Sequence, residues 1–367
     1  MIFRVVIKIR SFLALLLFLP VLFLTSCATS SGGGKSGGSS IGDTARYLGG
    51  LPGAARGDLA LPRSSPEWHA HASRMDALWS MQAGRQSHLR GFRKELGGLG
   101  SPGVLFYPFG GPDYLHASAL FPGANTYILV GLEGVEPMPD LASMSAPDLN
   151  HALGGVSNAL RTVTGASYFI TTEMRSDLSG TALRGTLPLL LAQIARDGKS
   201  VTSVEAVGLD GGGHLVSRGA GSGCPGWHIR AGEKNIFYFQ KDLSNGGLGD
   251  RRLLTFVSAK GAPVTFVKSA SYLMHQGNFS TIRDYIVNSS RGLVQCPSGV
   301  PYHCLKEGGW NLKLHGNYRG AADPFTSHSQ PDLAAAYVNG SQPVKPMKFG
   351  LGYLLDPKST CVIVGHR

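Results

Sequence analysis

The stretch that decides the fold is Val104-Leu105-Phe106-Tyr107-Pro108-Phe109-Gly110-Gly111-Pro112-Asp113, which is followed by Thr126-Tyr127-Ile128-Leu129-Val130-Gly131. Each contains a continuous run of apolar β-forming residues bounded by glycine or proline, a pattern typical of strands that are buried on both faces. Helical periodicity follows at 146–163. Because buried strands alternate with helices, we expect an α/β to α+β fold, with a mixed sheet flanked by helices and a second half that is more antiparallel.

Further elements follow from hydrophobic periodicity and from turn residues. The sequence predicts helices at 65–96, 146–163, 183–197 and 279–289, with Ser65 as the first N-cap, and strands at 168–172, 201–209, 214–217, 228–231, 236–240, 264–268 and 310–315. The globular part, 66–367, is long enough for one large domain or for two packed halves near 66–199 and 200–367.

The first 26 residues have the features of an export signal. Arg4, Lys8 and Arg10 precede an apolar run at 12–24, which is short for a transmembrane helix. The sequence Leu24-Thr25-Ser26-Cys27 then resembles the lipobox of bacterial lipoproteins. The resemblance implies that Cys27 is acylated and becomes the new N-terminus, and Ala28 after it suggests outer-membrane sorting. Residues 27–65 are rich in Gly, Ser and Pro, so we expect a flexible tether to a lipid-anchored domain in the periplasm or at the cell surface.

Charge and cysteine content bound the function. The formal net charge is +11, and three of the basic residues lie in the signal, which leaves +8 on scattered positions of the mature chain. This pattern indicates a solvated basic surface or contact with anionic lipids and envelope polymers, and nucleic acid is not an expected partner of an exported protein. In an oxidising compartment, four cysteines beyond Cys27 suggest two disulfides. The sequence favours Cys296–Cys304, closed by a turn, which leaves Cys224 with Cys361; zinc beside His303 is the weaker alternative.

One candidate site follows the first strand. Asp113 lies at the predicted N-cap of a short helix, and Glu133 comes just after the strand at 126–131. In a parallel sheet both carboxylates would emerge at the same edge, where ligands of open α/β sheets bind, and the pair could serve acid–base or cation chemistry. The simpler alternative is that Gly and Pro make a turn and Asp113 only caps the helix.

A second candidate is Lys268-Ser269-Ala270-Ser271-Tyr272-Leu273-Met274-His275. It holds residue types that serve nucleophilic catalysis, because a lysine can activate a serine. The spacing differs from known serine–lysine motifs, so a core role for Tyr272 with solvent-facing Lys268 and His275 is the competing interpretation.

Four stretches resemble a group of uncharacterised exported bacterial proteins, over most of the chain beyond the tether. They are 107–113, 130–133, 268–275 and Trp310-Asn311-Leu312-Lys313-Leu314-His315-Gly316-Asn317-Tyr318. The resemblance implies no known activity, but it adds weight to Asp113, Glu133, Lys268 and Tyr318 as candidate catalytic positions. That group tends to carry acidic residues before the Ser-Gly of 298–299, where this chain has Cys296 and Pro297, which puts a carboxylate role there in doubt.

Two classes of function stay open. The sequence favours a non-catalytic envelope protein that binds a partner protein or polymer, and the alternative is a periplasmic or surface hydrolase acting on an envelope component. No motif for a nucleotide or redox cofactor is visible, and we expect no bound cofactor or metal. A pocket gathering Asp113, Glu133, Lys268 and Tyr318 would favour the hydrolase, whereas dispersed positions would favour binding.

Overall fold

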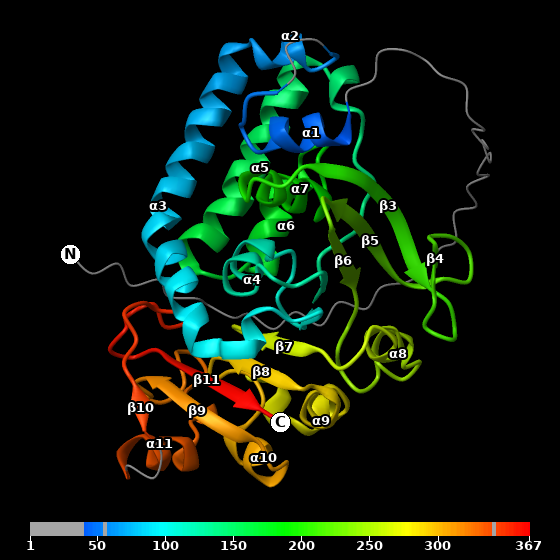
Figure 1. Cartoon of the computed structure of the whole chain (residues 1–367). Helices are drawn as coiled ribbons and strands as arrows, with labels where there is room; N and C mark the ends of the chain where they lie inside the picture. The colour runs from blue at the N-terminus through cyan, green and yellow to red at the C-terminus, as the bar shows by residue number, and fades with distance from the viewer. Residues whose placement is uncertain (1–39, 54–56, 340–342) are drawn as a thin grey trace. The chain divides into compact units, whose positions relative to one another are not determined.

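The computed structural model describes residues 40–53, 57–339 and 343–367. The predicted signal peptide, the predicted lipidation site at Cys27 and most of the predicted tether lie outside these residues. Within them the chain alternates strands and helices around one mixed sheet (Figure 1). None of the described helices is both long enough and apolar enough to cross a membrane.

The sheet has eleven strands in the order β10-β9-β11-β8-β7-β1-β2-β6-β5-β3-β4. The strands are β1 Val104–Tyr107, β2 Thr126–Gly131, β3 Val201–Leu209, β4 Leu215–Ser217, β5 Gly223–Ala231, β6 Lys234–Gln240, β7 Val264–Val267, β8 Gly292–Gln295, β9 Asn311–Gly316, β10 Val344–Lys345 and β11 Cys361–His366. The five central strands, β8-β7-β1-β2-β6, are all parallel to their neighbours. The flanks are antiparallel except for the β9–β10 pair.

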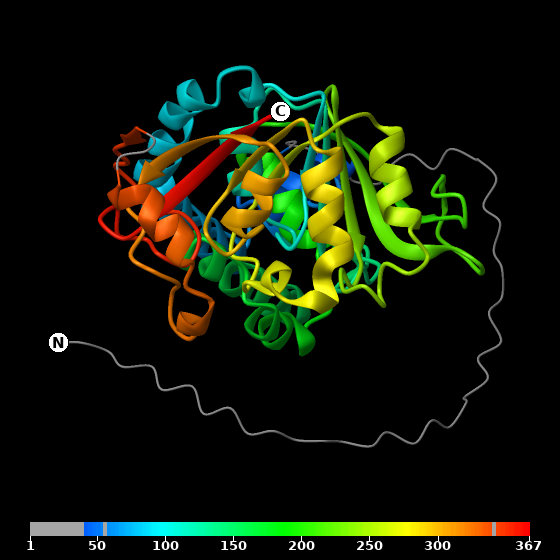
Figure 2. The ribbon, with the colours of Figure 1, turned by 90° about the horizontal axis from the view of Figure 1, so that it is seen from below.

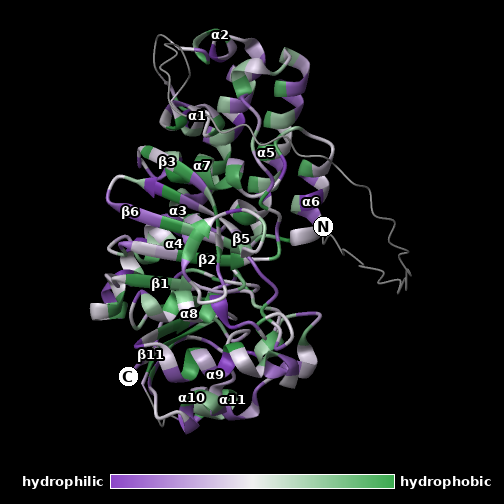
Figure 3. Cartoon of the chain, turned by 90° about the vertical axis from the view of Figure 1, so that its right-hand side faces the viewer, coloured by the Kyte–Doolittle hydropathy of each residue, from purple (hydrophilic) through white to green (hydrophobic). Residues whose placement is uncertain are grey.

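Helices cover both faces of this sheet. The α-helices are α1 Ile41–Leu48, α2 Ala60–Arg63, α3 Pro66–Leu96, α4 Tyr114–Leu120, α5 Ala146–Ala166, α6 Thr171–Ser179, α7 Leu187–Arg196, α8 Arg252–Ala259, α9 Ser280–Ser289, α10 Tyr302–Glu307 and α11 Pro331–Val338. One core joins α1 and α3–α7 to alternate strand residues such as Tyr107 and Leu129. The other joins α8–α11 to the opposite set, such as Phe106 and Ile128. The molecule therefore has three layers, a sheet between two layers of helices. Figure 2 shows α8 and α9 side by side in one helix layer. Figure 3 shows mostly hydrophobic residues on the central strands β1 and β2.

The fold class predicted from the sequence is confirmed, and so are most elements. Ser65 caps α3 by accepting from the Trp68 amide at 3.1 Å, and α5, α7, α9 and the hairpin of β3 and β4 lie where the pattern predicted them. The strand predicted at 168–172 is wrong, because residues 168–170 are irregular and α6 begins at Thr171. The two predicted halves share one sheet, so they form a single folded unit.

The tether predicted to reach residue 65 ends earlier. Ser40 caps α1, accepting from the Asp43 amide at 3.2 Å, and Tyr47 and Leu48 are buried against the core. Arg63 of α2 forms an ion pair of 3.0 Å with Asp43. The sequence pattern missed α1 because an eight-residue helix is too short to give a clear period, and it is held by tertiary packing.

Candidate functional site

The carboxyl ends of the central strands form one edge of the sheet, which we call the carboxyl edge. From β1 the chain moves to β2 and β6 on one side, and then returns to β7 and β8 on the other. The loop after β1 leads to α4 on the first face, whereas the loop after β7 leads towards α9 on the second. The gap between β1 and β7 is therefore the topological switch point, where ligands of open α/β sheets most often bind.

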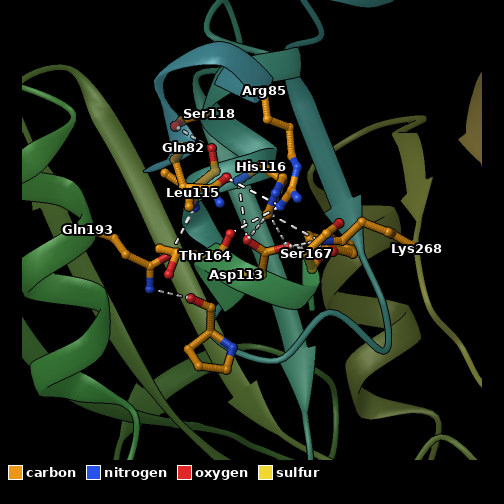
Figure 4. A network of polar contacts seen from close by, with 12 residues as sticks. Gln82, Arg85, Asp113, Leu115, His116, Ser118, Thr164, Ser167, Gln193 and Lys268 are labelled. Atoms are coloured by element: carbon orange, nitrogen blue, oxygen red, sulfur yellow. Dashed lines mark hydrogen bonds and ion pairs between the residues drawn. The ribbon is translucent and has the colours of Figure 1, made fainter. Parts of the chain in front are cut away.

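Asp113 lies at this switch point and is the last residue of the loop between β1 and α4. It is the N-cap of α4, and its Oδ1 accepts from the His116 amide at 3.2 Å. The same carboxylate contacts His116 Nδ1 at 2.9 Å and accepts the hydroxyl of Tyr107 at 2.9 Å. From α7, the amide of Gln193 clamps this loop through Pro112 and Leu115, each at 2.9 Å (Figure 4).

Lys268 reaches Asp113 from the end of β7. Its Nζ lies 2.7 Å from Asp113 Oδ2 and 3.1 Å from His116 Nδ1, and it also donates to the carbonyl of Ser167. Asp113 and His116 are 0% exposed and Lys268 is 1% exposed, so solvent reaches none of the three. Figure 4 shows the three side chains converging, two from the start of α4 and Lys268 from the residue after β7.

Charge balance fixes the protonation of this buried network. Burial alone would raise the pKa of Asp113, but the charges and hydrogen bonds of His116 and Lys268 outweigh it and hold that pKa below its usual range. Burial lowers the pKa of Lys268, with Asp113 opposing the shift, and burial likewise lowers the pKa of His116. The network contains a buried Asp–Lys ion pair with His116 against the same carboxylate, and removing only one partner of such a pair strongly destabilises the fold.

The backbone around the switch point is strained. Phe109, Ser167, Ser269, Ser271 and Tyr272 all have φ between 51° and 73°, and together they make five of the seven non-glycine residues with positive φ in the described chain. Such residues cost about 1–3 kcal/mol each and persist only where the surroundings hold them.

The chain itself holds the strained loop and covers it. The hydroxyl of Tyr353 donates to the carbonyl of Ser269 at 2.9 Å and accepts the amide of Ser271 at 3.0 Å. The amide of Gly352 donates to Ser167 Oγ at 3.3 Å, and a Cβ at Gly352 would lie 3.0 Å from Cys296 Sγ. We call Leu351–Tyr353 the plug, since Gly352 and Tyr353 form these contacts beside the end of β7.

The second candidate group is therefore divided. Lys268 turns to Asp113, whereas Ser269 Oγ is buried without a hydrogen-bond partner among the described residues. Tyr272 and Lys268 are buried, which agrees with the competing core interpretation for Tyr272 but not with a solvent-facing Lys268. His275 packs edge-on to the ring of Tyr272, at 5.2 Å between centroids. No base contacts the Ser269 hydroxyl, so the serine–lysine pair is not formed.

Glu133 is at the same edge but in a separate contact group. It is 3% exposed, and it accepts hydroxyls from Thr171 at 2.7 Å and Tyr238 at 3.1 Å. A Cβ at Gly111, where φ is +59°, would lie 3.0 Å from the Glu133 carboxylate, so glycine is needed for the loop to pass. The carboxylates of Asp113 and Glu133 have different hydrogen-bond partners among the described residues.

Tyr318 lies away from the other three candidates. Its hydroxyl accepts the amide of Gln330 at 2.7 Å, and its ring packs near Tyr337 after β9. The structure thus brings together Asp113 and Lys268, keeps Glu133 in a separate contact group on the same edge, and places Tyr318 after β9 in the core that packs against α8–α11.

The four described cysteines are free thiols, and neither predicted disulfide is present. Cys224 on β5 and Cys361 on β11 are separated by five strands, or roughly 25–30 Å, whereas a disulfide needs Cα atoms within about 7 Å. The loop after Cys296 is closed instead by Gln295, whose amide accepts from and donates to Val300 at 2.9 and 2.7 Å. No group of three His, Cys, Asp or Glu residues suited to a metal occurs in the described part of the chain.

An open cleft lies elsewhere on the carboxyl edge, at the ends of β2 and β6. Its volume is about 310 Å³, and its charged and amide-bearing lining residues are Glu136, Arg175, Arg184 and Gln240. The sequence pattern did not reveal the cleft because Arg175 and Arg184 come from α6 and from the loop after it, and α6 was not expected. No spacing signal links them to Glu136, which the fold brings close from the loop after β2.

Comparisons with known proteins do not identify a family for this chain. No family model matches the chain, and neither a curated protein nor a solved structure matches it.

Proposed function

We propose that this chain is a lipid-anchored envelope protein whose folded domain binds a partner or polymer and does not catalyse a reaction. One observation carries the proposal. The acid–base groups at the switch point, Asp113, His116 and Lys268, are fully buried, contact one another and lie beneath a strained loop that the plug covers, and His116 Nε2 has no hydrogen-bond partner among the described residues. A catalytic acid or base must reach a substrate proton, and solvent reaches none of these three side chains.

The membrane anchor in this proposal rests on the sequence alone. Three basic residues, an apolar run and Cys27 occur in the order that lipoprotein processing needs. Two or three acyl chains would anchor the domain lastingly, since each buried methylene contributes about 0.8 kcal/mol. Ala28 supports outer-membrane sorting.

Replacing Cys27 by Ser tests the anchor. We expect Cys27→Ser to abolish labelling by radioactive palmitate and to leave the precursor unprocessed, because the thiol is the acyl acceptor. Retained labelling of this variant would refute the lipobox, and Cys304→Ser, which removes a partly buried thiol of the folded domain, serves as the control that keeps its label.

A specific observation favours the hydrolase as second candidate. Ser269 follows a parallel strand with φ of +54° and has an unpartnered hydroxyl. A sharp strand-to-turn serine is the geometry of a nucleophile elbow, although here no base contacts it and the plug covers it.

A fluorophosphonate separates the two candidates. It phosphonylates an activated serine hydroxyl, forming an O–P bond and releasing fluoride. We expect the intact mass of the purified protein to stay unchanged, both for the wild type and for Ser269→Ala. A single adduct that Ser269→Ala abolishes would establish the hydrolase and overturn the binding proposal.

A further inference from the structure

The cleft beyond β2 and β6 carries positive charge that the protein does not neutralise. Neither Arg175 nor Arg184 forms an ion pair with a carboxylate in the described part of the chain, although Glu136 lines the same cleft. Both arginine side chains are exposed. Surface arginines without ion pairs are common, so it is the lining of one cleft by both arginines that indicates a ligand site.

Backbone carbonyls hold both guanidinium groups in place. Arg175 Nη2 donates to the carbonyl of Leu132 at 3.1 Å, and Arg184 Nε donates to the carbonyl of Thr181 at 3.1 Å. Each guanidinium carries five N–H donors in a planar fork. One anchoring bond to a carbonyl orients the fork and leaves other donors for a ligand, which lowers the entropy cost of binding.

The rest of the lining suits a small polar ligand. The amide of Gln240 also donates to the carbonyl of Leu132, at 3.3 Å, so the end of β6 and the start of α6 meet at that carbonyl. Met174 and Leu178 supply apolar surface to the same cleft. A volume of about 310 Å³ falls at the lower end for ligand pockets and fits a unit the size of one sugar.

We infer that this cleft binds an anionic group, a carboxylate or a phosphate on a sugar-sized unit, through Arg175 and Arg184. The inference rests on the proposed binding function and names its ligand class. Arginine forks match carboxylate and phosphate oxygens in pairs. The excess of positive charge on the mature chain also favours the approach of anions.

A substitution of Glu136 tests the sign of the charge on the ligand. A carboxylate in the same cleft repels a bound anion, so Glu136→Gln should tighten binding of a pure anion. If the natural ligand also carried an amine, the same change would weaken it.

Titration calorimetry of the full-length protein at low ionic strength tests the inference, with inorganic phosphate, glucuronate and the neutral sugar glucose as probes. We expect phosphate, glucuronate or both to bind and glucose not to bind. Arg175→Ala and Arg184→Ala should each weaken binding about tenfold, the effect of one charge-assisted hydrogen bond. Glu136→Gln should tighten it about threefold, as expected for an exposed charge.

Arg319→Ala is the matched control, since Arg319 is an exposed arginine that follows β9 away from the cleft. Binding to phosphate alone or to glucuronate alone identifies the source of the anionic group. The inference is overturned if neither anion binds, if glucose binds equally, or if both cleft arginines can be removed without effect while Tm is unchanged. Such a failure would leave the binding proposal standing, whereas a Ser269 adduct would remove that proposal itself.

Discussion

Two places along the carboxyl edge use ionisable residues in opposite ways. Between β1 and β7, Asp113, Lys268 and His116 are buried, paired with one another and covered by the plug. Beyond β2 and β6, Arg175 and Arg184 are exposed beside an open cleft and pair with no described carboxylate. The comparison teaches that the topological switch point, the usual ligand position, is here filled by a buried ion pair, whereas the anion site that we propose lies at the neighbouring strand ends.

The largest effect should come from breaking the buried ion pair. Lys268→Met or Asp113→Asn alone leaves one charge uncompensated in the core, so each should lower the free energy of unfolding by about 3–5 kcal/mol. The double variant removes both charges and should lose at least about 2 kcal/mol less than the sum of the single losses. Urea denaturation of the four proteins measures this coupling. Additive losses with almost no loss for Asp113→Asn would show that Asp113 acts as a helix cap and nothing more, because asparagine caps a helix as well as aspartate does.

Acidification should separate stability from binding. Burial lowers the pKa of His71 to about 4, despite a hydrogen bond with the Leu48 carbonyl at 2.9 Å. Between pH 6.5 and 4 the unfolded chain binds the proton and the folded chain does not, so stability falls as pH falls, by about 3 kcal/mol for His71. Burial lowers the pKa of His275 to about 4 too, which adds a loss of the same sign.

Thermal unfolding followed from pH 7 to pH 4 checks this loss. His71→Gln should flatten the profile, and His69→Gln, at an exposed position two residues earlier, should leave it unchanged. Arginine keeps its charge throughout this range, so the charge that we assign to anion binding does not titrate. If the stability of His71→Gln fell as steeply with pH as that of the wild type, His71 would not be the source of the loss.

The smallest effect compares two buried tyrosines on neighbouring strands. Tyr107 donates to the ionised Asp113 at 2.9 Å, whereas Tyr127 donates to the neutral carbonyl of Phe121 at 2.7 Å. Hydrogen bonds to charged groups are worth about 1.5–3 kcal/mol and neutral ones about 0.5–1.5 kcal/mol. Tyr107→Phe should therefore destabilise more than Tyr127→Phe in urea, with phosphate or glucuronate affinity unchanged in both. Equal losses would argue that Asp113 is not ionised in the folded protein.

The sequence allowed the strands and the cap to be predicted, but not the contacts between distant segments. The apolar runs of β1 and β2 and the cap at Asp113 are local signals, and each is present in the structure. The pairing of Asp113 with Lys268 depends on β1 lying next to β7, which no local pattern encodes. The same holds for the plug and for the cleft, whose residues come from separate elements.

Two stretches of the chain differ from the elements expected of them. Residues 168–172 contain aromatic and β-branched residues that favour a strand, yet α6 begins at Thr171 and packs Met174 and Leu178 into the core. Tertiary packing overrode the local preference. The run Cys361–His366 forms β11, although no strand was expected there.

Amide hydrogen exchange of the intact protein, with and without the anion that binds it most tightly, tests the division of the carboxyl edge most directly. Our account predicts that the anion slows exchange at 134–136 and 175–185, which surround the cleft, and leaves 269–272 unchanged. Slower exchange at 269–272 without protection at 175–185 would place the ligand at the switch point and contradict the account.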